Sequence, residues 1–63
     1  MPDYRCYFMD DQNHIREVEA LFDCPDDAEA MRLADALLAA RAYHHAAEVW
    51  DRERKVSRHV RQS

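Results

Sequence analysis

Apolar residues recur at helical spacing in one stretch of the chain. Counted from the first of them, they occupy positions i, i+3, i+4, i+7 and i+8, namely Ala30, Leu33, Ala34, Leu37 and Leu38, which places them in one stripe along a helix. Pro25 suits the first helical turn because its missing N–H is not needed there, and the acids that follow it face the positive end of the helix dipole. The pattern predicts a helix over residues 25–41 with Cys24 as its N-cap.

Two stretches before this helix have the composition of strands. Residues 4–9, YRCYFM, are rich in aromatic side chains, and residues 15–22, IREVEALF, alternate from Glu17 onward. The DDQNH segment between them is typical of a turn. Because the chain contains no glycine, Asn13 is the residue that we expect at a positive φ angle.

The loop between Met9 and Ile15 predicts the register of this hairpin. Closing it with residues 10–14 pairs Cys6 with Val18 and Arg5 with Glu19. One face then carries Tyr4, Cys6, Phe8, Val18, Ala20 and Phe22, and the other carries Arg5, Tyr7, Met9, Ile15, Glu17, Glu19 and Leu21. We expect the first face to pack in the core, because it is the more apolar one.

A second hairpin is predicted near the end of the chain. Residues 46–51, AAEVWD, and 55–60, KVSRHV, read as strands joined by a tight turn at Arg52 and Glu53. This pairing places Asp51 opposite Arg54, Trp50 opposite Lys55 and Val49 opposite Val56. Residues 61–63 are expected to fray. In an alternative interpretation, residues 42–49 extend the helix instead of beginning the third strand.

The predicted order of elements is strand, strand, helix, strand, strand. We therefore expect an α+β domain of ββαββ type over residues 1–63, with the helix packed on a four-stranded antiparallel sheet in the order 2-1-3-4. One helix covers one face of such a sheet. The uncovered face would present Tyr7, Met9, Ile15, Leu21 and Trp50. An apolar group of this size is typical of a contact surface, so we expect a homodimer or another protein partner there.

Composition narrows the class of protein. The chain has 63 residues, of which 48% are hydrophobic and 35% charged, and its net charge is −4. We expect no membrane-spanning segment, since no apolar run approaches about 18 residues. We also expect no signal peptide, because the N-terminal residues lack a basic region followed by a hydrophobic one. A cytoplasmic protein with reduced thiols is the expectation that follows.

The charge is unevenly distributed along the chain. Residues 1–51 hold twelve acids and four arginines, whereas residues 52–63 hold five basic residues and one acid, Glu53. The basic segment gives an alternative function, in which the chain binds nucleic acid with Trp50 or Tyr43 as a stacking surface. The contact residues would be Arg52, Arg54, Lys55 and Arg58.

No pattern of catalytic or metal-ligating residues is found. Cys24 precedes the helix, but three neighbouring acids disfavour a thiolate there, and Cys6 is too far along the predicted strand to reach it. His44 and His45 are sequence neighbours that would point apart, and His14 and His59 are isolated. We expect no catalytic residue, no metal site and no cofactor.

Three segments resemble short uncharacterised bacterial proteins that are common in alphaproteobacteria. They are YRCYFMDDQNHI, DCPDDAEA and EVWDRERKV, and those proteins usually carry glycine in the W-D turn where this chain has Arg52. The resemblance implies no activity. A weaker likeness, confined to a strand followed by the DDAEA helix, is to HicB-type antitoxin domains and would imply a toxin partner. The function that we expect is a small non-enzymatic module that associates with itself or with a partner.

Overall fold

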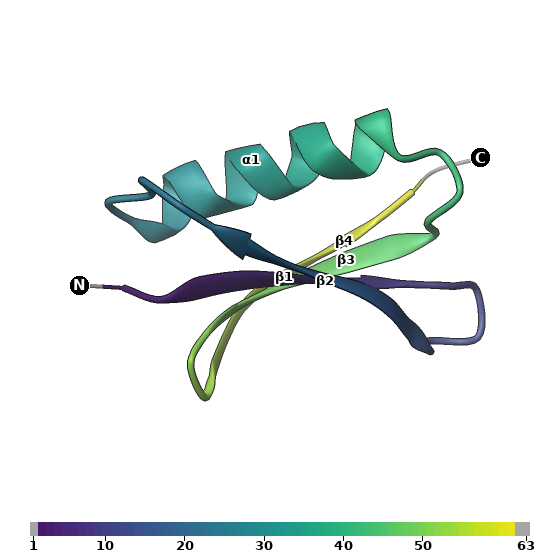
Figure 1. Cartoon of the computed structure of the whole chain (residues 1–63), viewed down its shortest axis with the longest axis horizontal. Coiled ribbons are helices and arrows are strands. Elements are labelled where there is room, and N and C mark those ends of the chain that lie inside the picture. The colour runs from purple at the N-terminus through teal and green to yellow at the C-terminus, as the bar shows by residue number, and fades with distance from the viewer. Residues whose placement is uncertain (1, 62–63) are drawn as a thin grey trace.

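The computed structural model, which describes residues 2–61, has the predicted ββαββ architecture. Strands β1 (Tyr4–Met9), β2 (Ile15–Leu21), β3 (Ala46–Asp51) and β4 (Arg54–Val60) form one antiparallel sheet in the order β2-β1-β3-β4. Helix α1 (Asp27–Ala40) lies across one face of this sheet (Figure 1). It packs against β3, β4 and β1. The fold class and the strand order are therefore confirmed.

Helix α1 begins two residues later than the position that we predicted. Its N-cap is Asp26, whose side chain accepts a hydrogen bond of 3.0 Å from the backbone N–H of Glu29. An aspartate oxygen satisfies an unpaired N–H of the first turn better than a thiol does. The prediction of Cys24 as the cap was therefore wrong.

The C-terminal end of the helix is held by a distant residue. The helix ends at Ala40, and residues 46–51 form β3, so the interpretation in which residues 42–49 extend the helix was also wrong. The Arg61 guanidinium donates to the carbonyl oxygens of Leu38, Arg41 and His44. Arg61 is therefore fixed rather than frayed, while residues 62 and 63 of the predicted tail lie outside the described residues.

The register of β2 differs from the prediction. Met9 does lie opposite Ile15, but a bulge between Phe8 and Met9 shifts all later pairs, so Cys6 lies opposite Glu19 and Tyr4 opposite Leu21. The shift by one residue exchanges the two faces of the strand. Glu17, Glu19 and Leu21 thus face the helix side, and Leu21 is buried at 6% exposure. Val18 and Phe22, which we predicted in the core, are exposed at 52% and 78%.

The core lies between α1 and the sheet, and its buried side chains come from α1, β1, β2 and β3. Phe8, Val49 and Cys6 are its largest fully buried side chains, and Ala30, Ala34 and Leu38 contribute the predicted helical stripe. Small alanines at two of these three helix positions let the helix approach the sheet closely. The core is therefore built from β1, β3 and α1, with Leu21 as the contribution of β2.

Within residues 2–61, three residues in the turns adopt a positive φ angle. Asn13 has φ 63°, as predicted, and Asp23 and Arg52 have φ 61° and 55°. Arg52 lies in the β3–β4 turn, where Asp51 pairs with Arg54 and Trp50 with Lys55 as predicted. A second bulge makes Val49 pair with Ser57 instead of Val56. Val56 packs against the core instead.

Candidate functional site

The sheet face that α1 leaves uncovered, called here the open face, carries three of the five predicted contact residues in reachable positions. Tyr7 and Trp50 are partly buried on it, and Ile15 is exposed. Together with Glu48 and Arg52 they line a shallow groove of about 300 Å³. Met9 also points to this side but is buried, with its Sδ 3.8 Å from the Arg58 guanidinium. Leu21 lies on the opposite side, which corrects its predicted place in this surface.

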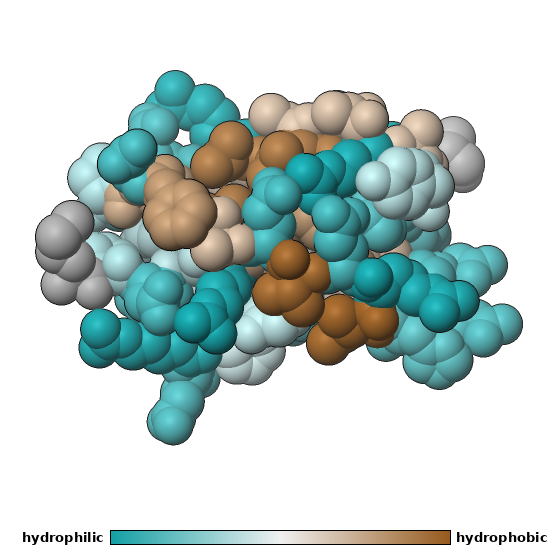
Figure 2. All heavy atoms as spheres, in the orientation of Figure 1, coloured by the Kyte–Doolittle hydropathy of each residue, from teal (hydrophilic) through white to brown (hydrophobic). Residues whose placement is uncertain are grey.

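Exposed apolar side chains are concentrated on β2. Ile15 and Val18 lie on the strand and Phe22 directly follows it, and all three are among the exposed large hydrophobic residues. In Figure 2 one row of hydrophobic side chains follows the course that β2 takes in Figure 1, below a second group that lies over α1. Because β2 is an edge strand, its outer side pairs with no other strand within residues 2–61. An exposed edge strand with apolar side chains can form backbone hydrogen bonds with a strand of another chain.

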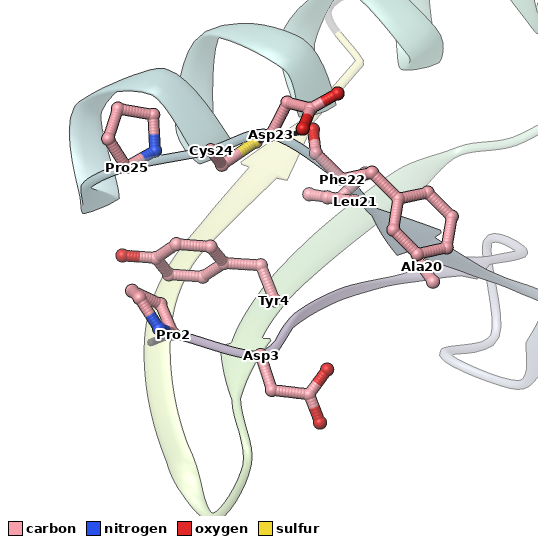
Figure 3. A pocket seen from close by; sticks show the side chains of 9 residues that line it. All are labelled: Pro2, Asp3, Tyr4, Ala20, Leu21, Phe22, Asp23, Cys24 and Pro25. Atoms are coloured by element: carbon pink, nitrogen blue, oxygen red, sulfur yellow. Dashed lines mark hydrogen bonds between the residues drawn. The ribbon is translucent and has the colours of Figure 1, made fainter.

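A hollow of about 580 Å³ adjoins the end of β2. Figure 3 shows Tyr4 below it, Cys24 and Pro25 above it and the Phe22 ring beside it. The Tyr4 hydroxyl is engaged, because it donates a 2.6 Å hydrogen bond to Asp27, and this bond is the main reason that the pKa of Tyr4 rises to about 12. The lining is mainly apolar, so the hollow suits an apolar group better than a charged one.

The predicted basic segment divides between the two faces of the sheet. Arg54 lies on the helix side, where it donates to both carboxylate oxygens of Asp27 at 3.0 and 3.1 Å and to Asp51 at 3.2 Å. These bonds raise the pKa of Arg54, and together with the Tyr4 hydroxyl they lower the pKa of Asp27 to about 2. Arg54 therefore joins the helix to the last hairpin, with both of its terminal nitrogens bonded to carboxylates.

The other basic residues of the segment lie on or beside the open face, around Glu48. Lys55 Nζ and Arg58 Nη1 lie 3.2 and 2.8 Å from one Glu48 oxygen, and Trp50 Nε1 donates to the other at 3.1 Å. Burial opposes ionisation of this carboxyl, but the hydrogen bonds from Trp50, Arg58 and Lys55 outweigh it and lower its pKa. Glu48 thus orients the indole ring and two cations on one surface.

A polar cluster on the helix side is a feature that sequence reasoning missed. Arg41 donates to Glu17 at 3.0 Å and to Glu19 at 2.8 Å, and His44 Nε2 lies 2.8 Å from Glu17. The Arg41 guanidinium also lies 5.0 Å from the centre of the Phe8 ring, on which His44 stacks at 4.9 Å. The bond to Glu19 is the main cause of the raised pKa of Arg41. No local pattern signals this cluster, because each of its hydrogen bonds joins residues that are 22 to 27 positions apart in the sequence.

The cysteines and histidines are dispersed. Cys6 and Cys24 are free thiols, and burial is the main cause of a raised pKa for both, to about 12 at Cys6. His59 Nδ1 pairs with Asp35 at 2.6 Å, and His14 lies near Asp10. Among the described residues no group of three or more His, Cys, Asp or Glu is placed to hold a metal ion. Nor does any helix in this part of the chain combine the length and apolar character that a membrane crossing requires.

Comparison with known proteins adds no relative: no family model, no curated protein and no solved structure matches this chain. The resemblances to short bacterial proteins and to HicB-type domains remain predictions.

Proposed function

We propose that this chain is a small self-associating protein that acts without catalysis, and that two copies pair through the edge strand β2. The observation that carries this proposal is the row formed by Ile15, Val18 and Phe22, which are exposed along a strand edge without a partner strand in residues 2–61. Ile15 and Val18 also belong to the open face, so the interface would include its rim. Pairing would cover the apolar row and add a backbone ladder at the same time.

The distribution of charge favours β2 over β4, the other edge strand, as the strand that pairs with a second copy. Strand β4 carries Arg54, Lys55 and Arg58, and such cations discourage strand pairing. The acids of β2, Glu17 and Glu19, are compensated by Arg41 within the same chain. Strand β2 therefore presents an edge with little net repulsion toward a second copy.

The sequence of β2 also favours a second copy in antiparallel orientation. Arg16, which contacts Asp10 at 3.1 Å, lies near the beginning of the strand, and Asp23 and Asp26 follow its end. Antiparallel pairing brings the beginning of one strand next to the end of the other, so opposite charges would meet twice across a two-fold axis. The exposed Phe22 ring and the hollow of about 580 Å³ lie on the same surface. In a two-fold dimer the same patch of each copy is in contact, so the ring of one copy could enter the hollow of the other.

A role without catalysis is supported by the state of the reactive groups. Both thiols have a raised pKa, which disfavours the nucleophilic thiolate. His44 is buried and bonded to Glu17, and its ring stacks on Phe8. The His44 ring therefore contributes to the packing of the fold.

The experiment is sedimentation analysis over about 1 μM to 1 mM protein, a range that covers weak and moderate association. We expect a monomer–dimer equilibrium that Val18→Arg abolishes. Val60→Arg is the matched control, since Val60 is exposed at 50% on the other edge strand and Val18 at 52% on β2. A chain that stays monomeric throughout, or a dimer that both variants weaken equally, contradicts the proposal.

A further inference from the structure

Two aromatic side chains lie next to each other on the central strands of the open face. Tyr7 is on β1 and Trp50 on β3, and the register pairs Tyr7 with Glu48 and Arg5 with Trp50. Tyr7 and Trp50 are therefore diagonal neighbours, with Cα atoms about 7–8 Å apart in such a pair. Both are partly exposed and line the same shallow groove. Flat rings at this spacing can each stack on one base of an extended strand.

Basic side chains surround these rings. Arg5 and Lys55 lie opposite Trp50 on the two neighbouring strands, Arg58 lies opposite Glu48, and Arg52 lines the groove. Glu48 is the one acid that the registers place among them, although Arg5 also lies 3.6 Å from Asp3 before the strand. The net charge of −4 therefore conceals a difference between the two sides of the sheet.

Six of the thirteen acids of the chain lie on the other side of the sheet. Asp26, Asp27, Glu29 and Asp35 belong to α1 or its cap, and Glu17 and Glu19 face the helix side of β2. A polyanion that approaches the open face meets cations and aromatic rings first. The sheet lies between it and these acids, and at about 0.1 M salt charges more than about 10 Å apart are largely screened.

We propose that the open face binds single-stranded nucleic acid, with Trp50 and Tyr7 stacking on bases and with Arg5, Arg52 and Lys55 contacting phosphates. A single strand fits better than a duplex, because stacking on the rings requires base faces that a duplex hides. This inference uses the central strands of the open face, whereas self-association uses the edge of β2, and the two surfaces share Ile15, which lines the groove.

The probes are a fluorescently labelled oligo(dT) of about ten nucleotides, its RNA counterpart and a duplex of equal length. We expect anisotropy to report binding of the single strands at about 50 mM salt. Two or three phosphate contacts predict that affinity falls about 7- to 20-fold between about 50 and 200 mM salt. Trp50 is the one tryptophan of the chain, so stacking should also quench the intrinsic fluorescence.

Matched variants test whether binding depends on the open face or on aromatic and basic residues anywhere on the chain. Trp50→Leu and Tyr7→Leu should each weaken binding about tenfold or more. Tyr43→Leu should leave it unchanged, because Tyr43 is exposed but lies before β3, where its ring is tilted against that of His44. Arg52→Gln should weaken binding, whereas Arg32→Gln, which removes the same charge from α1, should not. Glu48→Gln should tighten binding about threefold or more, since it removes the acid beside Lys55 and Arg58.

Several outcomes would overturn the inference. These are no binding at about 50 mM salt, preferential binding of the duplex, or equal losses in the Trp50→Leu and Tyr43→Leu variants. Thermal melting of each variant establishes that it is folded. Phe22→Ser should weaken self-association but still bind the oligonucleotide, because Phe22 follows the end of β2 and does not line the groove. A failure of self-association and a failure of nucleic-acid binding therefore give different results.

Discussion

Replacing each phenylalanine of the chain by alanine tests the register of the β1–β2 hairpin. The chain has two phenylalanines, Phe8 and Phe22. With the register expected from the loop length, both side chains lie on the core face. In the structure Phe8 is fully buried at 0% exposure, whereas Phe22 is exposed at 78%. The same substitution should therefore lower the free energy of unfolding strongly at Phe8 and very little at Phe22.

The expected magnitudes follow from this difference in burial. Phe8→Ala removes a ring that stacks on His44 and lies beneath Arg41, and such a deletion costs about 3–5 kcal/mol. The whole chain should have a stability of about 3–9 kcal/mol, at about 0.05–0.15 kcal/mol per residue. Phe8→Ala should consequently lose about a third or more of the free energy of unfolding. Phe8→Leu, a milder change, should cost about 1 kcal/mol, and Phe22→Ala should stay within about 0.5 kcal/mol of the parent chain.

The assay is urea denaturation followed by circular dichroism and by the fluorescence of Trp50. Protein concentration is kept below the range of self-association, so that the measured free energy of unfolding refers to the monomer. The variants should shift the midpoint without changing the slope. A loss of about 2 kcal/mol or more in Phe22→Ala would refute the bulged register and favour the regular one, in which both phenylalanines lie on the core face. No loss in Phe8→Leu would contradict both registers, since each places Phe8 in the core.

Three further predictions concern single contacts. The pKa of Asp27 is about 2 in the folded chain against 3.8 unperturbed. The parent chain should therefore be more stable than Asp27→Asn above about pH 4, and this difference should disappear as the pH falls toward 2. Thermal melts in which the two chains differ equally at all pH values would contradict this. Arg61→Gln should cost about 1–3 kcal/mol, because three backbone carbonyls lose a charged donor, and amide exchange should show the loss at the last turn of α1 rather than throughout the helix. Arg52→Gly should stabilise the chain by about 0.5–1 kcal/mol, since φ is 55° there; Arg52→Ala, measured by the same denaturation, should bring no such gain.

Local pattern predicts the elements of this chain because their causes are local. The helical stripe of alanines and leucines, the alternation of β3 and the turn residues around Asn13 each act within a few neighbours in sequence. The strand order follows from them, since the simplest packing of ββαββ places β3 beside β1. The cap of α1 was misplaced by two residues because Pro25 was taken for the first helical position.

The candidate site was predicted only in part. Tyr7, Ile15 and Trp50 follow from alternation along strands, whereas Val18 and Phe22 were assigned to the core. One bulge accounts for these errors, because a shift of one residue exchanges the faces of everything that follows it. Sequence reasoning also treated the basic segment as one unit, although Arg54 faces the helix and Lys55 the open face.

Local sequence pattern is enough to specify the five elements, their order and the stripe of α1 that packs on the sheet. The face of β2 that points inward depends instead on contacts between distant residues. Alternation alone sends Glu17 and Glu19 outward, since unpaired carboxylates are costly to bury. Arg41 and His44 come from the end of α1 and the connection after it, and they supply the partners that let these acids face the helix. That arrangement turns Val18 outward at an unpaired edge, where we propose that a second copy binds.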